Sequence, residues 1–194
     1  MVRVALVTLG VIALVVGPAW GQARPAPAAG TPAAKPAAKA GAGPTAVVRM
    51  ESGGEFALEF WPGVAPGHVK NFLDLARKKF YDGQRVHRVE PGFVVQFGDP
   101  QSKTLPVTDP KMGTGGPGYT IKAEFNDRPF DRGVLGMART QDPNSAGSQV
   151  YVMLGPAHFL NKQYTAFGRV TRGMEVVDKI KVGDRITSIR VVGP

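Results

Sequence analysis

Beyond residue 45, short segments of alternating hydrophobic and polar residues predict β-strands that are buried on one face. Two of them, Ala46–Met50 and Glu55–Phe60, flank Ser52-Gly53-Gly54, and this arrangement predicts a hairpin. Further strands are predicted over Arg85–Val89, Phe93–Phe97, Tyr119–Ala123, Val134–Ala138, Gln149–Leu154, Thr165–Thr171 and Ile186–Val192. The region is therefore expected to be mainly β.

Two segments instead carry hydrophobic residues at helical spacing. The first begins near Pro66, which suits a first helical turn, and its apolar stripe consists of Val69, Phe72, Leu73, Ala76 and Phe80. The second, Met174–Lys181, is followed by Gly183. About eight strands and two helices fit a closed antiparallel β-barrel of eight strands, capped at its ends by the two helices.

The first 23 residues have the pattern of a secretory signal. Arg3 supplies a positive charge, Val4–Val16 is mostly apolar, and Gly21–Ala23 offers the small residues that a signal peptidase requires. We therefore expect export to the periplasm or another extracytoplasmic compartment. The alternative is an uncleaved membrane anchor, although the run is shorter than the roughly 20 residues that span a bilayer and Gly17-Pro18 interrupts it.

Residues 24–45 consist almost wholly of Ala, Pro, Gly and Lys. This composition cannot bury a core, so a solvated linker with partly polyproline-like character is expected. Residues 46–194 then form one domain. We expect that domain to be a monomer, with membrane contact only if the signal segment is uncleaved.

Composition excludes several kinds of chemistry. The chain has no Cys, which rules out disulfides, thiolate catalysis and Cys-based zinc sites. The three histidines, His68, His87 and His158, are not at metal-ligand spacing, so neither a metal nor another cofactor is expected. The net charge is +9, but Arg77-Lys78-Lys79 is the one basic triplet, and nucleic-acid binding usually needs a concentrated basic patch.

Three segments carry the candidate chemistry. In Val86–Asp99, Arg88 lies in an otherwise apolar strand, and a Pro91-Gly92 turn leads to Phe93 and a strand in which Val94 and Gln96 share one face. The segment Leu135–Val152 contains Ala138 and Arg139, followed by Gln149 and Tyr151, which again share a face. The last segment contains Phe159, Leu160 and Tyr164.

In this order and at this spacing, the three segments closely resemble the cyclophilins, which are peptidyl-prolyl cis-trans isomerases (EC 5.2.1.8), and the bacterial secreted branch in particular. The resemblance covers residues 46–192. It implies an eight-stranded barrel with two capping helices and a shallow proline-binding groove on the outer face.

The resemblance also implies roles for individual residues. Arg88 matches the catalytic arginine of the family. The substrate-binding positions are Phe93, Val94, Tyr151 and Leu160 around the proline ring, Gln96 and Gln149 as polar groups of the groove, the Ala138-Arg139 edge, and Phe159 and Tyr164 on the groove wall. Arg139 stands where many members have Asn and so adds a cation at the groove edge.

The expected function is to accelerate rotation about Xaa-Pro bonds in exported proteins and so to assist their folding. Proline-containing polypeptides are the expected partners. The alternative is a module or chaperone that binds proline-containing segments without turnover. The presence of Arg88 favours the enzyme, because binding alone requires no hydrogen-bond donor at the prolyl nitrogen.

Overall fold

The computed structural model describes residues 43–193. The predicted signal segment 1–23 and nearly all of the predicted linker lie outside these residues. The strands are β1 (Thr45–Met50), β2 (Glu55–Phe60), β3 (Arg88–Glu90), β4 (Val94–Phe97), β5 (Val134–Met137), β6 (Val150–Met153), β7 (Ala166–Arg172) and β8 (Ile186–Val192). The helices are α1 (Pro66–Arg77) and α2 (Met174–Val177), with short 3-10 helices η1 (Pro100–Lys103) and η2 (His158–Leu160).

All eight strands belong to one antiparallel sheet in the order β3-β4-β6-β5-β7-β2-β1-β8. The two outer strands, β3 and β8, are brought together by the segments that precede them. Arg85 bridges Arg185, and the Val86 N–H donates to the Asp184 carbonyl at 2.8 Å. The sheet thus curls on itself, which confirms the predicted mainly-β architecture of eight antiparallel strands with two helices.

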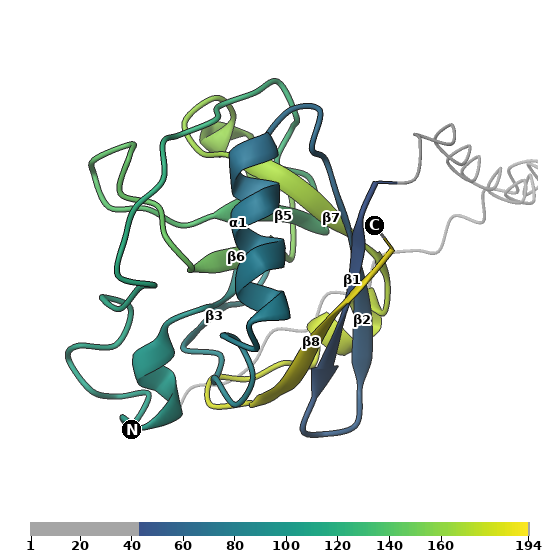
Figure 1. The fold of residues 1–194 in the computed structure, drawn as a ribbon. Coiled ribbons are helices and arrows are strands. Elements are labelled where there is room, and N and C mark those ends of the chain that lie inside the picture. Colours follow the sequence, from purple (N-terminus) through teal and green to yellow (C-terminus); the bar gives the residue numbers. More distant parts are fainter. Residues whose placement is uncertain (1–42, 194) are drawn as a thin grey trace, which may run out of the picture. The chain divides into compact units, whose positions relative to one another are not determined.

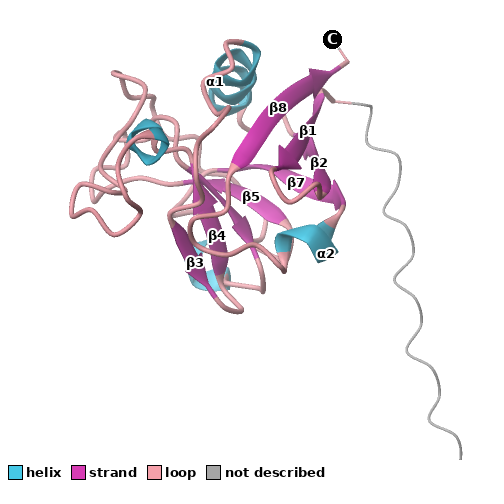
Figure 2. Ribbon diagram, turned by 90° about the horizontal axis from the view of Figure 1, so that it is seen from below, coloured by secondary structure: helices cyan, strands magenta, loops and turns pink. Residues whose placement is uncertain are grey.

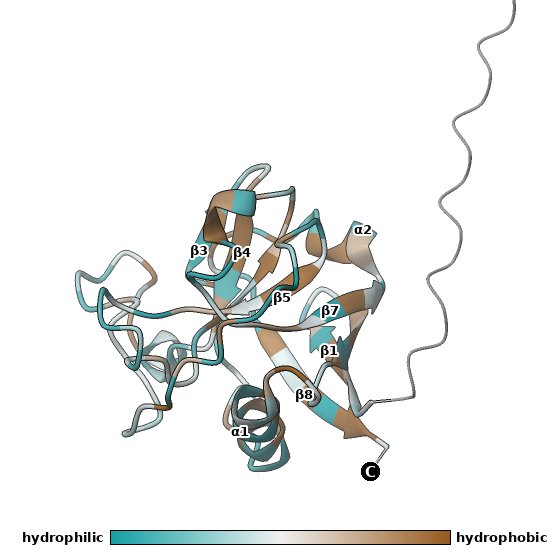
Figure 3. Ribbon diagram, turned by 90° about the horizontal axis from the view of Figure 1, so that it is seen from above, coloured by the Kyte–Doolittle hydropathy of each residue, from teal (hydrophilic) through white to brown (hydrophobic). Residues whose placement is uncertain are grey.

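Helix α1 covers one side of the curled sheet and contacts β8 and β7 (Figure 1). Its hydrophobic and hydrophilic residues lie on different sides (Figure 3), and the buried side includes Val69, Phe72 and Ala76 from the predicted stripe. The short helix α2 lies beside β2, away from β3 and β4 (Figure 2). In residues 43–193, no helix combines the length and the hydrophobicity that crossing a bilayer would take.

Strands β4 and β6 bury residues on both faces. Val95, Phe97 and Val152 join the main hydrophobic core inside the curl. Val94 and Tyr151, on the opposite face, belong to a second, smaller cluster. The second cluster forms a hydrophobic surface layer on the outer face of the sheet.

Several sequence predictions of secondary structure differ from the structure. Helix α1 ends at Arg77, before Phe80 of the predicted stripe, and the strand predicted over Arg85–Val89 is shortened and shifted to β3. Tyr119–Ala123 forms no strand beyond a single bridge from Ile121 to Ala146, because its next N–H groups bond to side chains: Ala123 donates to Asn144 and Glu124 to Thr165. The second helix ends at Val177 rather than Lys181. After Val177, Lys179 and Ile180 each donate to the residue three positions earlier, which is the hydrogen-bond pattern of a 3-10 helix. Runs of this pattern are usually short.

The start of the domain also differs slightly from the prediction. Thr45, the last residue assigned to the linker, opens β1, and the Pro44 carbonyl accepts a hydrogen bond of 3.2 Å from the Phe60 N–H. Pro44 and Thr45 therefore belong to the domain rather than to the linker.

We expect a chain that starts at Gly43 to keep its fold and its catalytic turnover, because the composition of residues 24–42 offers no core. Thermal unfolding and peptide turnover of the truncated and full chains would be compared. A fall in melting temperature beyond about 2–4 °C, the scale of roughly 1 kcal/mol in a domain of about 150 residues, would contradict the prediction.

Candidate active site

A hollow of about 310 Å³ lies on the outer face of the sheet, above the second hydrophobic cluster. We call it the Arg88 hollow. It is lined by Arg88, Phe93, Val94, Gln96, Ala138, Arg139, Tyr151, Phe159, Leu160 and Tyr164. These are all of the predicted site residues except Gln149. The structure thus brings together side chains from three separate segments of the sequence.

Strand register explains why three of these side chains meet. Arg88 on β3 is directly opposite Gln96 on β4, and Gln96 is directly opposite Tyr151 on β6. Residues that are directly opposite in an antiparallel pair project from the same face of the sheet. Tyr151 is in turn opposite Gly136 on β5, so one row of four positions crosses the sheet.

The floor of the hollow is formed by Tyr151, Val94 and Leu160, which are all buried. The Tyr151 ring lies directly over Gly136: a Cβ atom on Gly136 would stand only 2.3 Å from Tyr151 Cζ. Phe130 supports the other side, with its ring stacked 6.0 Å from the Tyr151 ring. The absence of a side chain at Gly136 therefore fixes where the floor lies.

Two stacked aromatic rings form one wall. The ring centroids of Phe93 and Phe159 are 5.9 Å apart, and Phe159 is 68% exposed. A large exposed hydrophobic ring at the rim can contact an incoming apolar group without first having to be uncovered.

Arg88 stands at the edge of the floor with about half of its side chain exposed. Its guanidinium carbon lies 5.9 Å from the centre of the Phe93 ring. Its Nη1 donates to Gln96 Oε1 at 3.3 Å, and its Nε is 3.5 Å from Glu90 Oε1. These contacts orient the guanidinium while leaving donors free to face the hollow.

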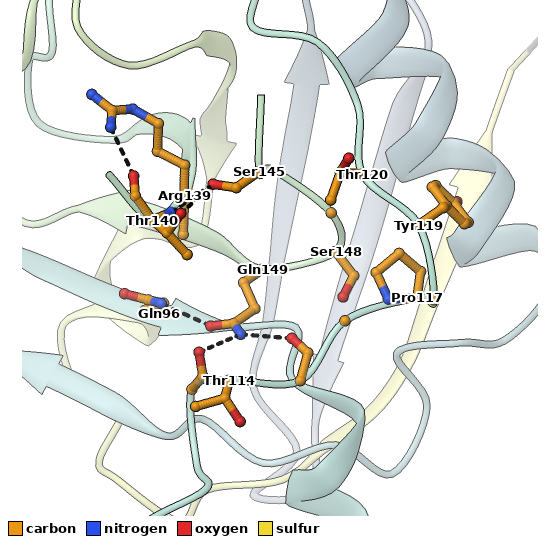
Figure 4. A pocket seen from close by; sticks show the side chains of 16 residues that line it. Gln96, Thr114, Pro117, Tyr119, Thr120, Arg139, Thr140, Ser145, Ser148 and Gln149 are labelled. Carbon is orange, nitrogen blue, oxygen red and sulfur yellow. Dashed lines mark hydrogen bonds between the residues drawn. The ribbon is translucent and has the colours of Figure 1, made fainter. Parts of the chain in front are cut away.

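A chain of hydrogen bonds holds Gln96 in the orientation that Arg88 needs (Figure 4). Gln149 Nε2 donates to the carbonyls of Gly113 and Gly115, each at 2.8 Å. Gln149 Oε1 must then act as acceptor, and it accepts from Gln96 Nε2 at 3.0 Å. This leaves Gln96 Oε1 as the acceptor for Arg88. Gln149 thus lies outside the Arg88 hollow and acts on it through Gln96.

Asp99 anchors the far end of this chain, and the sequence analysis missed it. It is fully buried, and its carboxylate accepts from the N–H groups of Gly113 and Gly115 at 2.7 and 3.1 Å and of Gln101 at 2.8 Å. The available signal was an acidic residue immediately before Pro100, a typical cap for a helical turn. Gly136 was also missed, although a glycine inside a strand often marks a close approach.

The Ala138-Arg139 edge is only partly open. The Ala138 N–H donates to the Gln149 carbonyl at 2.9 Å, so this N–H is already occupied. The Arg139 side chain bends back: Nε and Nη2 donate to the Gln163 carbonyl at 3.1 and 2.9 Å, and its guanidinium carbon lies 4.4 Å from the centre of the Tyr164 ring. Arg139 therefore forms part of the rim of the hollow.

Burial keeps the neighbouring titratable groups neutral. Desolvation lowers the pKa of His87, so its imidazole is uncharged at pH 7 next to Arg88. Desolvation also raises the pKa of the Tyr151 hydroxyl well above its usual range. The hollow thus presents fixed positive charge on arginine around an uncharged hydrophobic floor. That arrangement suits stabilisation by a charged hydrogen-bond donor rather than proton transfer.

We expect Gln149→Leu to lower turnover about two- to tenfold, because one hydrogen bond of roughly 0.5–1.5 kcal/mol no longer orients Gln96 and Arg88. Turnover and thermal unfolding would be measured together. Unchanged turnover in a variant that melts like the wild type would contradict the role of this hydrogen-bond chain.

Comparisons with known proteins agree with the geometry. Residues 46–192 match the model of the cyclophilin type peptidyl-prolyl cis-trans isomerase/CLD family. A probable peptidyl-prolyl cis-trans isomerase of Brucella abortus is 42% identical over 153 residues, which cover 77% of this chain and 78% of the Brucella protein. Peptidyl-prolyl cis-trans isomerase B of Bacillus subtilis is 41% identical over 146 residues, or 74% of this chain and 95% of that protein.

A solved structure shows the same fold. The chain matches the crystal structure of a cyclophilin type peptidyl-prolyl cis-trans isomerase from Cryptosporidium parvum with a TM-score of 0.66 and 26% identity. The match covers 78% of this chain and 98% of the other.

Proposed function

Because the chain belongs to the cyclophilin-type peptidyl-prolyl cis-trans isomerase family, we propose that it accelerates rotation about Xaa-Pro bonds in exported proteins and so assists their folding. The observation that supports the catalytic part is the position of Arg88 at the edge of a hydrophobic hollow of about 310 Å³. The observation that supports export is the signal-like pattern of residues 1–23.

The reaction sets the requirements for the site. A peptide bond resists rotation by about 18–20 kcal/mol because the nitrogen lone pair is delocalised into the carbonyl. Before proline both isomers are populated, and their uncatalysed exchange takes tens to hundreds of seconds. Rotation forms and breaks no covalent bond. The enzyme only has to stabilise the twisted state, in which the nitrogen has lost its conjugation.

We propose that the prolyl ring rests on the floor formed by Tyr151, Val94 and Leu160, beside the stacked rings of the wall. Arg88 then donates a hydrogen bond to the prolyl nitrogen. That nitrogen becomes a useful acceptor only when conjugation breaks, so the bond strengthens as the amide twists. The hydrogen-bond chain through Gln96 and Gln149 holds the guanidinium in place before the substrate arrives.

Export is tested by fractionation. We expect the protein in the periplasm or another extracytoplasmic compartment, with a mature N-terminus just after Ala23, because a signal peptidase would cleave after the small residues there. Cells that express the full chain would be fractionated and the N-terminus determined by mass spectrometry. A full-length chain in the cytoplasm would refute export, and a full-length chain in the membrane would support the uncleaved anchor.

A further inference from the structure

The lining of the Arg88 hollow carries positive charge, and Glu90, which is not part of that lining, is the acidic partner of Arg88. A second hollow, of about 520 Å³, adjoins it and shares Gln96, Ala138 and Arg139 as a common wall. Its remaining lining includes the glycine loop Gly113–Gly118. The residues that line the two hollows contain two charged side chains, Arg88 and Arg139, and no carboxylate.

The positive charge of Arg139 has no acidic partner among residues 43–193. No ion pair in this part of the chain includes Arg139. Its hydrogen bonds go to backbone carbonyls alone: to Gln163, to Thr140 at 2.8 Å and to Gln141 at 3.2 Å. Carbonyl groups orient a guanidinium but leave its net charge in place.

The Arg139 guanidinium is also held firmly before any ligand binds. Its contact with the Tyr164 ring and its bonds to the Gln163 carbonyl fix its position at the rim between the two hollows. Figure 4 shows the Arg139 side chain extending away from Gln96 and Gln149, with its hydrogen bond to the Thr140 carbonyl. A charge that is already ordered loses little side-chain entropy when it meets an anion. One of its five N–H groups also remains available.

From this uncompensated, preorganised charge we infer that the groove selects client segments with an acidic side chain within two residues of the proline, and that Arg139 determines this specificity. The inference rests on the proposed function, because it names the substrate class of the same site. An Asp or Glu side chain next to a proline seated in the Arg88 hollow would meet Arg139 at the rim, whereas a Lys side chain would be repelled.

The test uses short peptides that contain one proline and carry Glu, Gln or Lys in turn at each of the two positions on either side of it. The efficiency kcat/KM would be measured by magnetic-resonance exchange at low and high salt. At one or more positions, we expect Glu peptides to be turned over about fivefold more efficiently than Lys peptides, the scale of roughly 1 kcal/mol for a partly exposed charge pair. The ratio should shrink at high salt.

The preference should disappear in Arg139→Gln and persist in Arg139→Lys, which keeps the charge. The matched control is Arg128→Gln, an exposed arginine 4.9 Å from the Trp61 ring that lines neither hollow; its Glu-to-Lys ratio should equal that of the wild type. Using the ratio within each variant removes any general loss of activity. Equal turnover of Glu and Lys peptides by the wild type, or an unchanged ratio in Arg139→Gln, would overturn the inference alone. Failure to turn over any peptide would overturn the proposed function as well.

Discussion

Replacing Arg88 with alanine is expected to lower the turnover of a proline-containing peptide by at least tenfold while leaving the fold intact. The side chain is about half exposed and contributes nothing to the core, so the variant should melt close to the wild type. Its proposed hydrogen bond forms in the twisted state. A bond to a charged donor is worth about 1.5–3 kcal/mol, and each 1.36 kcal/mol changes a rate by a factor of ten.

Two further variants separate catalysis from binding. Tyr151→Ala removes the floor of the hollow and should weaken peptide affinity, measured by calorimetry, whereas Arg88→Ala should retain much of that affinity. Arg190→Ala, an exposed arginine on β8, serves as the surface control and should turn over normally. If Arg88→Ala turned over as fast as the wild type, the proposed mechanism would be wrong, and the binding-module alternative would be favoured.

Gly136→Ala adds one methyl group, yet we expect it to lower both the stability and the catalytic efficiency of the enzyme. The added Cβ would stand 2.3 Å from Tyr151 Cζ and 2.5 Å from the Tyr151 hydroxyl oxygen, so the buried ring or the backbone at residue 136 must shift. Overpacking of this kind costs about 1–3 kcal/mol. We expect a melting temperature lower by roughly 2–12 °C and a fall in kcat/KM of about tenfold or more, since a displaced floor no longer receives the prolyl ring.

Gly63→Ala provides the matched control, because no atom of residues 43–193 lies within 4 Å of the Cβ that it would add. That variant should resemble the wild type in both melting temperature and kcat/KM. Wild-type behaviour of Gly136→Ala would show that Tyr151 can shift without affecting the site, and would contradict the close fit described for this row of the sheet.

Much of the fold followed from local patterns. Alternation located the β1–β2 hairpin, and the spacing of Val69, Phe72 and Ala76 located α1, because these signals depend on residues close in sequence. The same reasoning wrongly predicted a strand over Tyr119–Ala123. Its alternation is that of a strand, but after the Ile121 bridge the N–H groups of Ala123 and Glu124 donate to side chains from distant segments, a possibility that a local pattern does not reveal.

The candidate site could be predicted as far as a motif names residues. The family resemblance identified the residues that line the Arg88 hollow, and the structure brings them together. It could not show that Gln149 acts through Gln96, because Gln149 bonds to residues 34 and 53 positions away in the sequence. Nor could it show that Asp99 holds the glycine loop, because those hydrogen bonds join residues 14 and 16 positions apart. Which of these residues are hydrogen-bonded to one another becomes visible only in the three-dimensional structure.

The pairing of β1 with β8 has a consequence for how the chain folds. Thr45 and Val192 are 147 positions apart, and the bond between them closes one of the largest loops in the domain. Contacts of such long range form slowly, because the entropy of loop closure must be lost before the contact is gained. Until β8 arrives, one edge of β1 has unpaired N–H and C=O groups, which can pair with another chain. The emerging protein therefore passes through a period in which it is itself prone to aggregate, and that period ends only after the last strand has been synthesised.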